Sequence, residues 1–137
     1  MTTDDAYYYW DRGDGSKLTN YFKASEFECR CGCLKQRISK ALLERLDDIR
    51  EDLGDPIQIH SGFRCAAKQA QLATQGYETA KGVSQHELGN AADVSAVGMG
   101  ELLQLLRGKF KAIGTARTFC HVDIRDDKQR YWSYSSM

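Results

Sequence analysis

Proline and histidine are scarce in this chain, and neither sign of charge predominates. Only one proline and three histidines occur among 137 residues, while 19 lysines and arginines balance 19 aspartates and glutamates. A chain without a basic excess lacks the electrostatic footprint of a nucleic-acid-binding protein, so we expect no nucleic-acid partner. The few histidines that stand beside other potential ligands become candidate functional residues.

Long apolar runs are also absent. No stretch approaches the roughly 18–20 apolar residues that span a bilayer, so we expect no membrane insertion. Residues 1–15 are acidic and aromatic and lack the basic start and apolar segment of a secretory signal. We therefore expect the protein to be cytoplasmic as synthesised. Its composition, 42% hydrophobic and 28% charged, is typical of a globular domain.

The five cysteines are an odd number. Cys29, Cys31 and Cys33 are crowded together, whereas Cys65 and Cys120 stand apart. The triplet does not match the two-residue spacing of common zinc sites, and a reducing cytoplasm favours free thiols. We interpret the triplet as structural or incidental. Weak metal binding by these thiols and a disulfide among the five remain open.

Two regions can be distinguished along the chain. Residues 1–16 are predicted to form an N-terminal aromatic arm, because three tyrosines and Trp10 are too apolar to stay in solvent. The arm is expected to pack on the domain or on a partner, which includes self-association or a virion contact. Residues 17–137 are predicted to form a single domain.

The clearest helix covers residues 39–53. Apolar residues recur there every three or four positions, Ser39 offers an N-cap, and Gly54 and Pro56 follow as stop signals. We also expect a short turn or helix within 18–27, helices over 65–73 and 101–106, strands over 57–60, 91–96, 119–124 and 131–134, and a polar loop over 74–89. This order predicts an α+β domain with a small sheet.

Three residues form a candidate metal site. A catalytic zinc takes three protein ligands from histidine, carboxylate or thiolate and leaves one position for water. His86 precedes a turn, Asp93 lies in the strand predicted after it, and His121 lies in another strand. Neighbouring strands lie about 4.8 Å apart, so ligands on them can share one ion. The alternative reading is a solvated His86 and Asp93 with a structural pair at His121.

The motif Ser-x-His-x-x-Gly-x-Ala-x-Asp at residues 84–93 resembles the metal motif of the zinc D-Ala-D-Ala carboxypeptidase and endopeptidase family. This family acts on peptidoglycan stem peptides and shares its metal site with lysostaphin-type enzymes and the hedgehog domain. Three further blocks match in the same order, in short domains of phage endolysin type. These are Ser-Glu-Phe with the cysteine triplet at 25–33, Ile-x-Ile-x-Ser-Gly-Phe-Arg at 57–64, and Phe-x-His-Val-Asp at 119–123.

The resemblance implies a small, mostly antiparallel sheet flanked by helices and a role for each matching residue. It makes His86, Asp93 and His121 the zinc ligands. Arg64 matches an arginine that steadies the substrate's carboxylate or carbonyl, although it could also be a surface arginine. Ser84 is either a substrate contact or a cap of the metal loop.

The catalytic base departs from the family pattern. Many members place an acidic residue three positions before the last ligand, or a histidine two positions before it, where this chain has Thr118 and Phe119. Asp123 shares a strand face with His121, so we predict it to be the base, with orientation of a ligand as its alternative role. His60 is the other titratable candidate.

These roles predict a zinc peptidase with D,D- or L,D-carboxypeptidase or endopeptidase activity on peptidoglycan. It would serve cell-wall lysis or remodelling and would act after release or delivery, in a bacteriophage context. A domain of the same fold that binds zinc without catalysis, in a virion or on the cell wall, is the first rival. The second is a redox or metal-handling protein built on the cysteine triplet, in which replacing His86 would have no effect.

Overall fold

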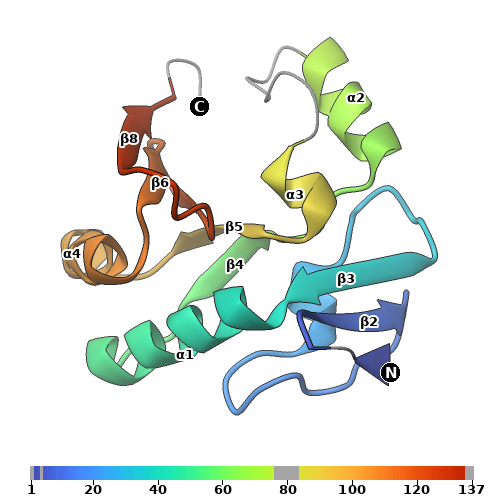
Figure 1. Ribbon diagram of the computed structural model, residues 1–137, viewed down its shortest axis with the longest axis horizontal. Helices are drawn as coiled ribbons and strands as arrows, with labels where there is room; N and C mark the ends of the chain where they lie inside the picture. The colour runs from blue at the N-terminus through green and yellow to red at the C-terminus, as the bar shows by residue number, and fades with distance from the viewer. Residues whose placement is uncertain (1, 4, 76–83, 135–137) are drawn as a thin grey trace.

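The computed structural model describes residues 2–3, 5–75 and 84–134, which form two sheets and several helices (Figure 1). A three-stranded sheet has the order β1-β2-β3, and a five-stranded sheet has the order β4-β5-β7-β6-β8. In chain order the elements are β1 (Thr2–Thr3), β2 (Tyr7–Asp11), the 3-10 helix η1 (Ala24–Phe27), β3 (Lys35–Ser39), α1 (Lys40–Leu53), β4 (Gln58–Ser61), α2 (Ala66–Thr74), α3 (Gln85–Leu88), β5 (Ala91–Ser95), α4 (Met99–Lys109), β6 (Ala112–Thr115), β7 (Cys120–Asp123) and β8 (Arg130–Ser133).

Helix α1 confirms the helix predicted from local signals. The Ser39 side chain accepts a hydrogen bond from the Leu42 backbone N–H at the first turn. Gly54 ends the helix in the left-handed region at a φ of 75°, where glycine has no Cβ to clash. The apolar stripe of α1 packs into the core together with Leu102 and Leu106 of α4.

The five-stranded sheet has two chemically different faces, because side chains alternate along each strand. Ala92, Val94, Cys120 and Val122 of the central strands β5 and β7 enter the hydrophobic core. The residues between them point to the opposite face. All strand pairs in both sheets are antiparallel except β6–β8. The expected α+β fold with a mostly antiparallel sheet is therefore confirmed.

The aromatic N-terminus belongs to this fold. Residues 7–11 form β2, which pairs antiparallel with β3 from Tyr7↔Ser39 to Asp11↔Lys35. Trp10 is only 3% exposed and lies in the core. Residues 7–11 of the predicted arm thus pack on the domain, one of the two alternatives, and they do so as a strand because aromatic side chains suit a pleated, half-buried surface.

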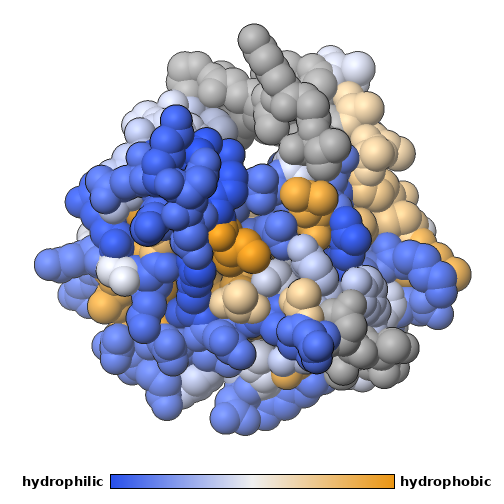
Figure 2. Space-filling view, viewed as in Figure 1, coloured by the Kyte–Doolittle hydropathy of each residue, from blue (hydrophilic) through white to orange (hydrophobic). Residues whose placement is uncertain are grey.

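Other elements differ from the sequence prediction in ways that matter for the site. Residues 85–88, predicted as loop, form the short helix α3, while residues 76–83 of that loop lie outside the described part. Strands β3 and β6 were not predicted. No helix in the described ranges is long and apolar enough to cross a membrane. The face in Figure 2 is mostly hydrophilic, with a lightly hydrophobic strip over α2, where Ala66, Ala67 and Ala70 are exposed.

Candidate metal centre

Three potential metal ligands meet on the polar face of the five-stranded sheet. Asp93 of β5 stands directly opposite His121 of β7 in their antiparallel pairing. His86 comes from α3, which leads into β5. Ser84 fixes the start of this helix, because its side chain accepts a hydrogen bond from the His86 backbone N–H at 3.1 Å. All three ligand candidates are buried.

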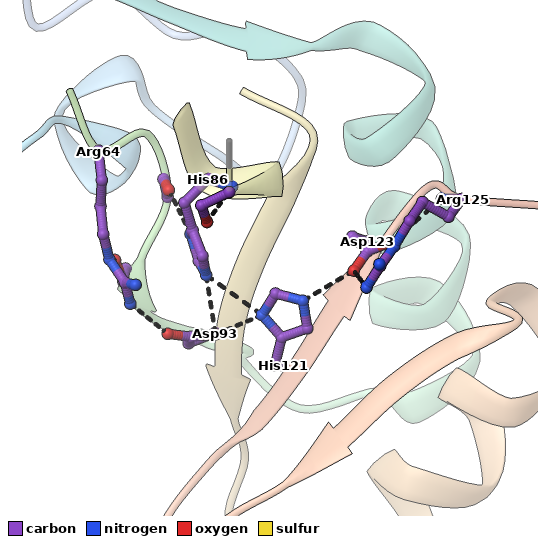
Figure 3. Close-up of polar contacts among 9 residues, drawn as sticks. Arg64, His86, Asp93, His121, Asp123 and Arg125 are labelled. Atoms are coloured by element: carbon purple, nitrogen blue, oxygen red, sulfur yellow. Dashed lines mark hydrogen bonds and ion pairs between the residues drawn. The ribbon is translucent and has the colours of Figure 1, made fainter. Parts of the chain in front are cut away.

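The donor atoms form a nearly equilateral triangle. His86 Nε2 lies 3.2 Å from His121 Nδ1 and 3.3 Å from Asp93 Oδ1. The third side, from His121 Nδ1 to Asp93 Oδ1, is 3.1 Å. Figure 3 shows the two imidazole rings and the carboxylate converging on this point. The structure therefore brings together the three residues that the sequence singled out.

The remaining ring nitrogens fix which atoms face the triangle. His86 Nδ1 lies 2.7 Å from the Gly62 carbonyl oxygen, and His121 Nε2 lies 2.8 Å from Asp123 Oδ2. A carbonyl and an ionised carboxylate only accept hydrogen bonds, so each ring must donate at that nitrogen. In the neutral rings His86 Nε2 and His121 Nδ1 then present lone pairs to each other and to Asp93.

This donor set fits a zinc ion. Three acceptor atoms in contact repel one another unless a cation or a proton lies between them. Tetrahedral zinc with bonds of about 2.0–2.1 Å to nitrogen holds its ligand atoms about 3.3–3.4 Å apart, close to the triangle's sides. Two imidazoles and one carboxylate also match the ligand types of catalytic zinc sites.

The electrostatics are consistent with a cation site. Burial raises the pKa of Asp93, but the adjacent His86 and His121 more than offset this and hold the pKa well below its usual range. Burial lowers the pKa of His86 and keeps that ring neutral. Burial also lowers the pKa of His121, yet its hydrogen bonds to Asp123 and Asp93 raise it overall. Without a metal, His121 is therefore the ring that takes up a proton.

Arg64 lies at the edge of the triangle. Its Nη2 donates to Asp93 Oδ2 at 2.8 Å, and its Nε donates to Ser61 Oγ at 2.9 Å. The guanidinium thus holds the carboxylate oxygen that does not face the histidines. These contacts place Arg64 at the site, while its predicted contact with substrate stays a prediction. Ser84 acts as the cap of α3, one of the two roles left open for it.

Asp123 lies on the other side of His121 from His86 and Asp93 (Figure 3). Its carboxylate accepts hydrogen bonds from His121 Nε2, from Arg125 Nε and Nη2, each at 2.8 Å, and from the Arg125 backbone N–H at 3.1 Å. Burial opposes ionisation, but these donors lower the pKa of Asp123 to about 2. The geometry favours the second predicted role for Asp123, the orientation of His121, over the role of base.

Two aromatic residues of the last strand region border the site, and sequence reasoning missed them. The Trp132 ring centroid lies 5.4 Å from that of His121, and the Tyr134 centroid lies 6.5 Å from it. Gly114, opposite His121 on β6, makes room for both rings. Burial raises the pKa of Tyr134 to about 12, so its hydroxyl stays protonated. The alternation of Trp132 and Tyr134 in the sequence was the signal from which their shared face could have been predicted.

His60, the other candidate base, is not part of the triangle. Its Nε2 lies 2.7 Å from Ser95 Oγ, and its ring packs 6.1 Å from that of Phe119 between centroids. His60 therefore lies on the same sheet as the candidate ligands but is held by a serine on the edge pair β4–β5.

Comparison with known proteins adds an independent observation. The model of the family described as Peptidase M15 matches residues 20–124 of this chain. The match spans the three ligand candidates together with Arg64 and Asp123. No curated protein matches the chain.

Proposed function

The chain belongs to the peptidase M15 family, and we propose that it is a zinc-dependent peptidase that hydrolyses peptide bonds in peptidoglycan stem peptides or cross-links. The observation that carries this proposal is the buried triangle of His86 Nε2, Asp93 Oδ1 and His121 Nδ1. A peptidase activity follows from the family. The metal and the substrate are the proposed part.

The chain's own residues supply positioning and charge. When bound by His86, Asp93 and His121, zinc polarises a carbonyl and lowers the pKa of a water molecule. Asp123 holds the Nε2–H of His121, so that Nδ1 keeps its lone pair directed at the triangle. We therefore propose that Asp123 orients His121, in place of the role of base that the sequence predicted.

Arg64 and Tyr134 are the groups that we propose to meet the substrate. The hydrogen bonds from Arg64 to Asp93 and Ser61 fix its guanidinium, which suits a carboxylate or carbonyl of a peptide. The Tyr134 hydroxyl, protonated at neutral pH, can donate a hydrogen bond to the oxygen on which negative charge develops. For proton transfer, His60 is the other residue that the sequence proposes, and it is tested as such below.

We propose a cell-wall role, in lysis or remodelling and in a phage context, with peptidoglycan peptides as the partner. The motif resemblance supports this substrate, and Arg64 beside the proposed zinc site suits a peptide that ends in a carboxylate. Identification of the peptide bond that is cut would distinguish a carboxypeptidase from an endopeptidase. We propose that the protein is made in the cytoplasm and reaches its substrate after release or delivery.

A zinc-binding domain without catalysis is the rival function. It is favoured by one observation, the engagement of both Asp123 oxygens by His121 and Arg125. Because both Asp123 oxygens are engaged in this way, Asp123 is not free to accept a proton, and such a site would bind metal and turn over poorly. Such a domain would serve a virion or bind the cell wall.

The test compares wild-type protein with His86→Ala, with His60→Ala as a matched histidine control. We expect His86→Ala to contain one zinc ion fewer per chain, by mass spectrometry of the metal, and His60→Ala to retain the wild-type content. Each protein is then incubated with purified stem peptides of defined sequence, and the products are identified by mass.

Cleavage by the wild type and its loss in His86→Ala would support the peptidase. Equal zinc content in His86→Ala and wild type would refute the assigned metal centre. Zinc that is lost in His86→Ala, without cleavage of any cell-wall peptide by the wild type, would favour the binding domain. Retained zinc with lost cleavage in His60→Ala would support His60 as the base.

A further inference from the structure

Four of the five cysteines come together at a second place in the fold. Three of them lie in the irregular segment between η1 and β3, and the fourth immediately precedes α2. Their sulfur atoms all lie within 4.8 Å of one another, in the set Cys29, Cys31, Cys33 and Cys65. The spacing along the chain gave no such signal, because the fold brings in the fourth thiol from a distant segment.

The sulfur atoms are separated by distances that suit a single metal ion. Cys31 Sγ lies 3.0 Å from Cys65 Sγ, and Cys29 Sγ lies 3.3 Å from Cys31 Sγ and 3.7 Å from Cys65 Sγ. With zinc–sulfur bonds of about 2.3 Å, a tetrahedral site has sulfur–sulfur edges of about 3.8 Å. The four thiols thus need only a small expansion to enclose the ion.

The surrounding groups donate hydrogen bonds to these sulfurs. The backbone N–H of Cys33 donates to Cys31 Sγ at 3.3 Å, and that of Cys65 donates to Cys29 Sγ at 3.4 Å. Donors of this kind stabilise thiolates and orient metal ligands. The backbone of the cluster thus supplies a donor to two of the four sulfurs.

A buried polar side chain completes the surroundings. Gln36 is only 2% exposed, and its Nε2 donates to the Cys33 carbonyl oxygen at 2.8 Å and to Cys33 Sγ at 3.4 Å. Its Oε1 accepts from the Cys29 backbone N–H at 2.7 Å. Gln36 therefore fixes two of the four cysteines from strand β3. These hydrogen bonds hold the segment between η1 and β3 in place at its cysteines.

We propose that these four thiolates bind a second zinc ion, which is structural and separate from the centre at His86. A closed set of four thiolates is the usual donor set of structural zinc, in contrast to the three-ligand set of a catalytic ion. A disulfide accounts for the arrangement less well. It would join two of the four sulfurs at about 2.0 Å and leave the other two beside it without a role.

The ion would fasten two irregular segments beside the catalytic site. Cys65 adjoins Arg64, which donates to Asp93, and the same segment supplies the Gly62 carbonyl that holds His86. The Phe63 backbone N–H donates to the Phe27 carbonyl oxygen at 2.9 Å, next to the cysteine segment. Binding of zinc by Cys65 and the triplet would therefore keep Arg64 and Gly62 in place.

The test counts zinc and thiols in the purified full chain. We expect two zinc ions per wild-type chain and one in His86→Ala, where the remaining ion protects the four thiols from alkylation until a chelator is added. Cys31 is the exposed member of the cluster, so Cys31→Ser disturbs the core least and should lose the second ion. Cys120→Ala removes a thiol outside the cluster and should keep both ions.

Cobalt substitution supplies a readout that does not depend on folding of the cysteine variant. Cobalt bound in His86→Ala should show intense sulfur-to-metal charge-transfer absorption and the visible bands of a tetrahedral site. A His86→Ala protein that holds no metal and has four freely alkylated thiols would overturn the proposal. So would a wild-type protein that lacks two titratable thiols because of a disulfide, or one that contains iron at the cysteines.

Discussion

Replacement of Asp123 by asparagine separates the two roles open to this residue. Asp123 is fully buried and accepts four hydrogen bonds, from His121 Nε2 and from Arg125. An amide of the same shape offers one oxygen where the carboxylate offered two. Whichever way the amide is oriented, its NH2 group must face two donors, so His121 and Arg125 cannot both keep their partners.

The cost can be worked out from these contacts. A buried donor left unsatisfied costs about 1–3 kcal/mol, so Asp123→Asn should destabilise the protein by about that amount. The loss of a carboxylate that holds a metal-bound histidine lowers metal affinity by about 10- to 100-fold. That change in zinc affinity corresponds to about 1.4–2.8 kcal/mol.

The assay measures zinc affinity by competition with a chromophoric chelator and kcat at saturating zinc in the same preparation. Asp126→Asn is the matched control, because this aspartate lies in the loop that follows β7 and pairs with Arg45 at the surface. Loss of a surface ion pair costs about 0–1 kcal/mol, so the control should retain both zinc affinity and kcat.

The two roles of Asp123 predict different results for zinc affinity and kcat. If Asp123 is the base, its loss lowers kcat by about 100- to 10,000-fold while zinc affinity stays at the wild-type value. If it orients His121, zinc affinity falls first, and much of the activity returns when zinc is saturating. Unchanged zinc affinity in Asp123→Asn would therefore show that the contact with His121 does not hold the ligand in place.

Two further predictions concern packing and pH. In Gly114→Ala the new Cβ would lie 2.6 Å from the Trp132 ring and 2.8 Å from Tyr134, so we expect a loss of about 1–3 kcal/mol in thermal denaturation. Gly108→Ala, with nothing within 4 Å, should be neutral or stabilising. Because the folded pKa of Asp123 is about 2 against an ordinary 3.8, about 2 kcal/mol of its stabilisation is present above pH 3.8 and is lost as the pH falls toward 2. Urea denaturation of metal-free protein checks this pH dependence, and Asp123→Asn should lack it.

The parts of the fold that local signals determine were predictable from the sequence. The limits of α1 follow from Ser39, which caps the first turn, and from Gly54, which adopts a left-handed conformation after the last. Both signals act within a few residues and need no tertiary context. The four-residue helix α3 has a similar cap in Ser84 but is too short to show a helical period, so it was predicted as loop.

Strands β3 and β6 were not predictable in the same way. Strand β3 alternates burial only in part, and β6 has only four residues, among which Gly114 leaves room for Trp132. Strand β3 pairs with β2 across the intervening residues 12–34, and register between segments that far apart leaves no local mark. The thiol cluster was missed for the same reason, since only the fold brings Cys65 to the triplet.

The role of Asp123 shows where strand alternation stops being informative. Alternation places Asp123 and His121 on one face of β7, as predicted, and that proximity is compatible with a base or with an orienting partner. The distinction depends on which ring nitrogen the carboxylate meets. An imidazole presents its two nitrogens on different sides, so a carboxylate 2.8 Å from Nε2 does not also stand beside the metal-facing Nδ1. Arg125, two residues further along, engages both carboxylate oxygens and keeps the group in that place.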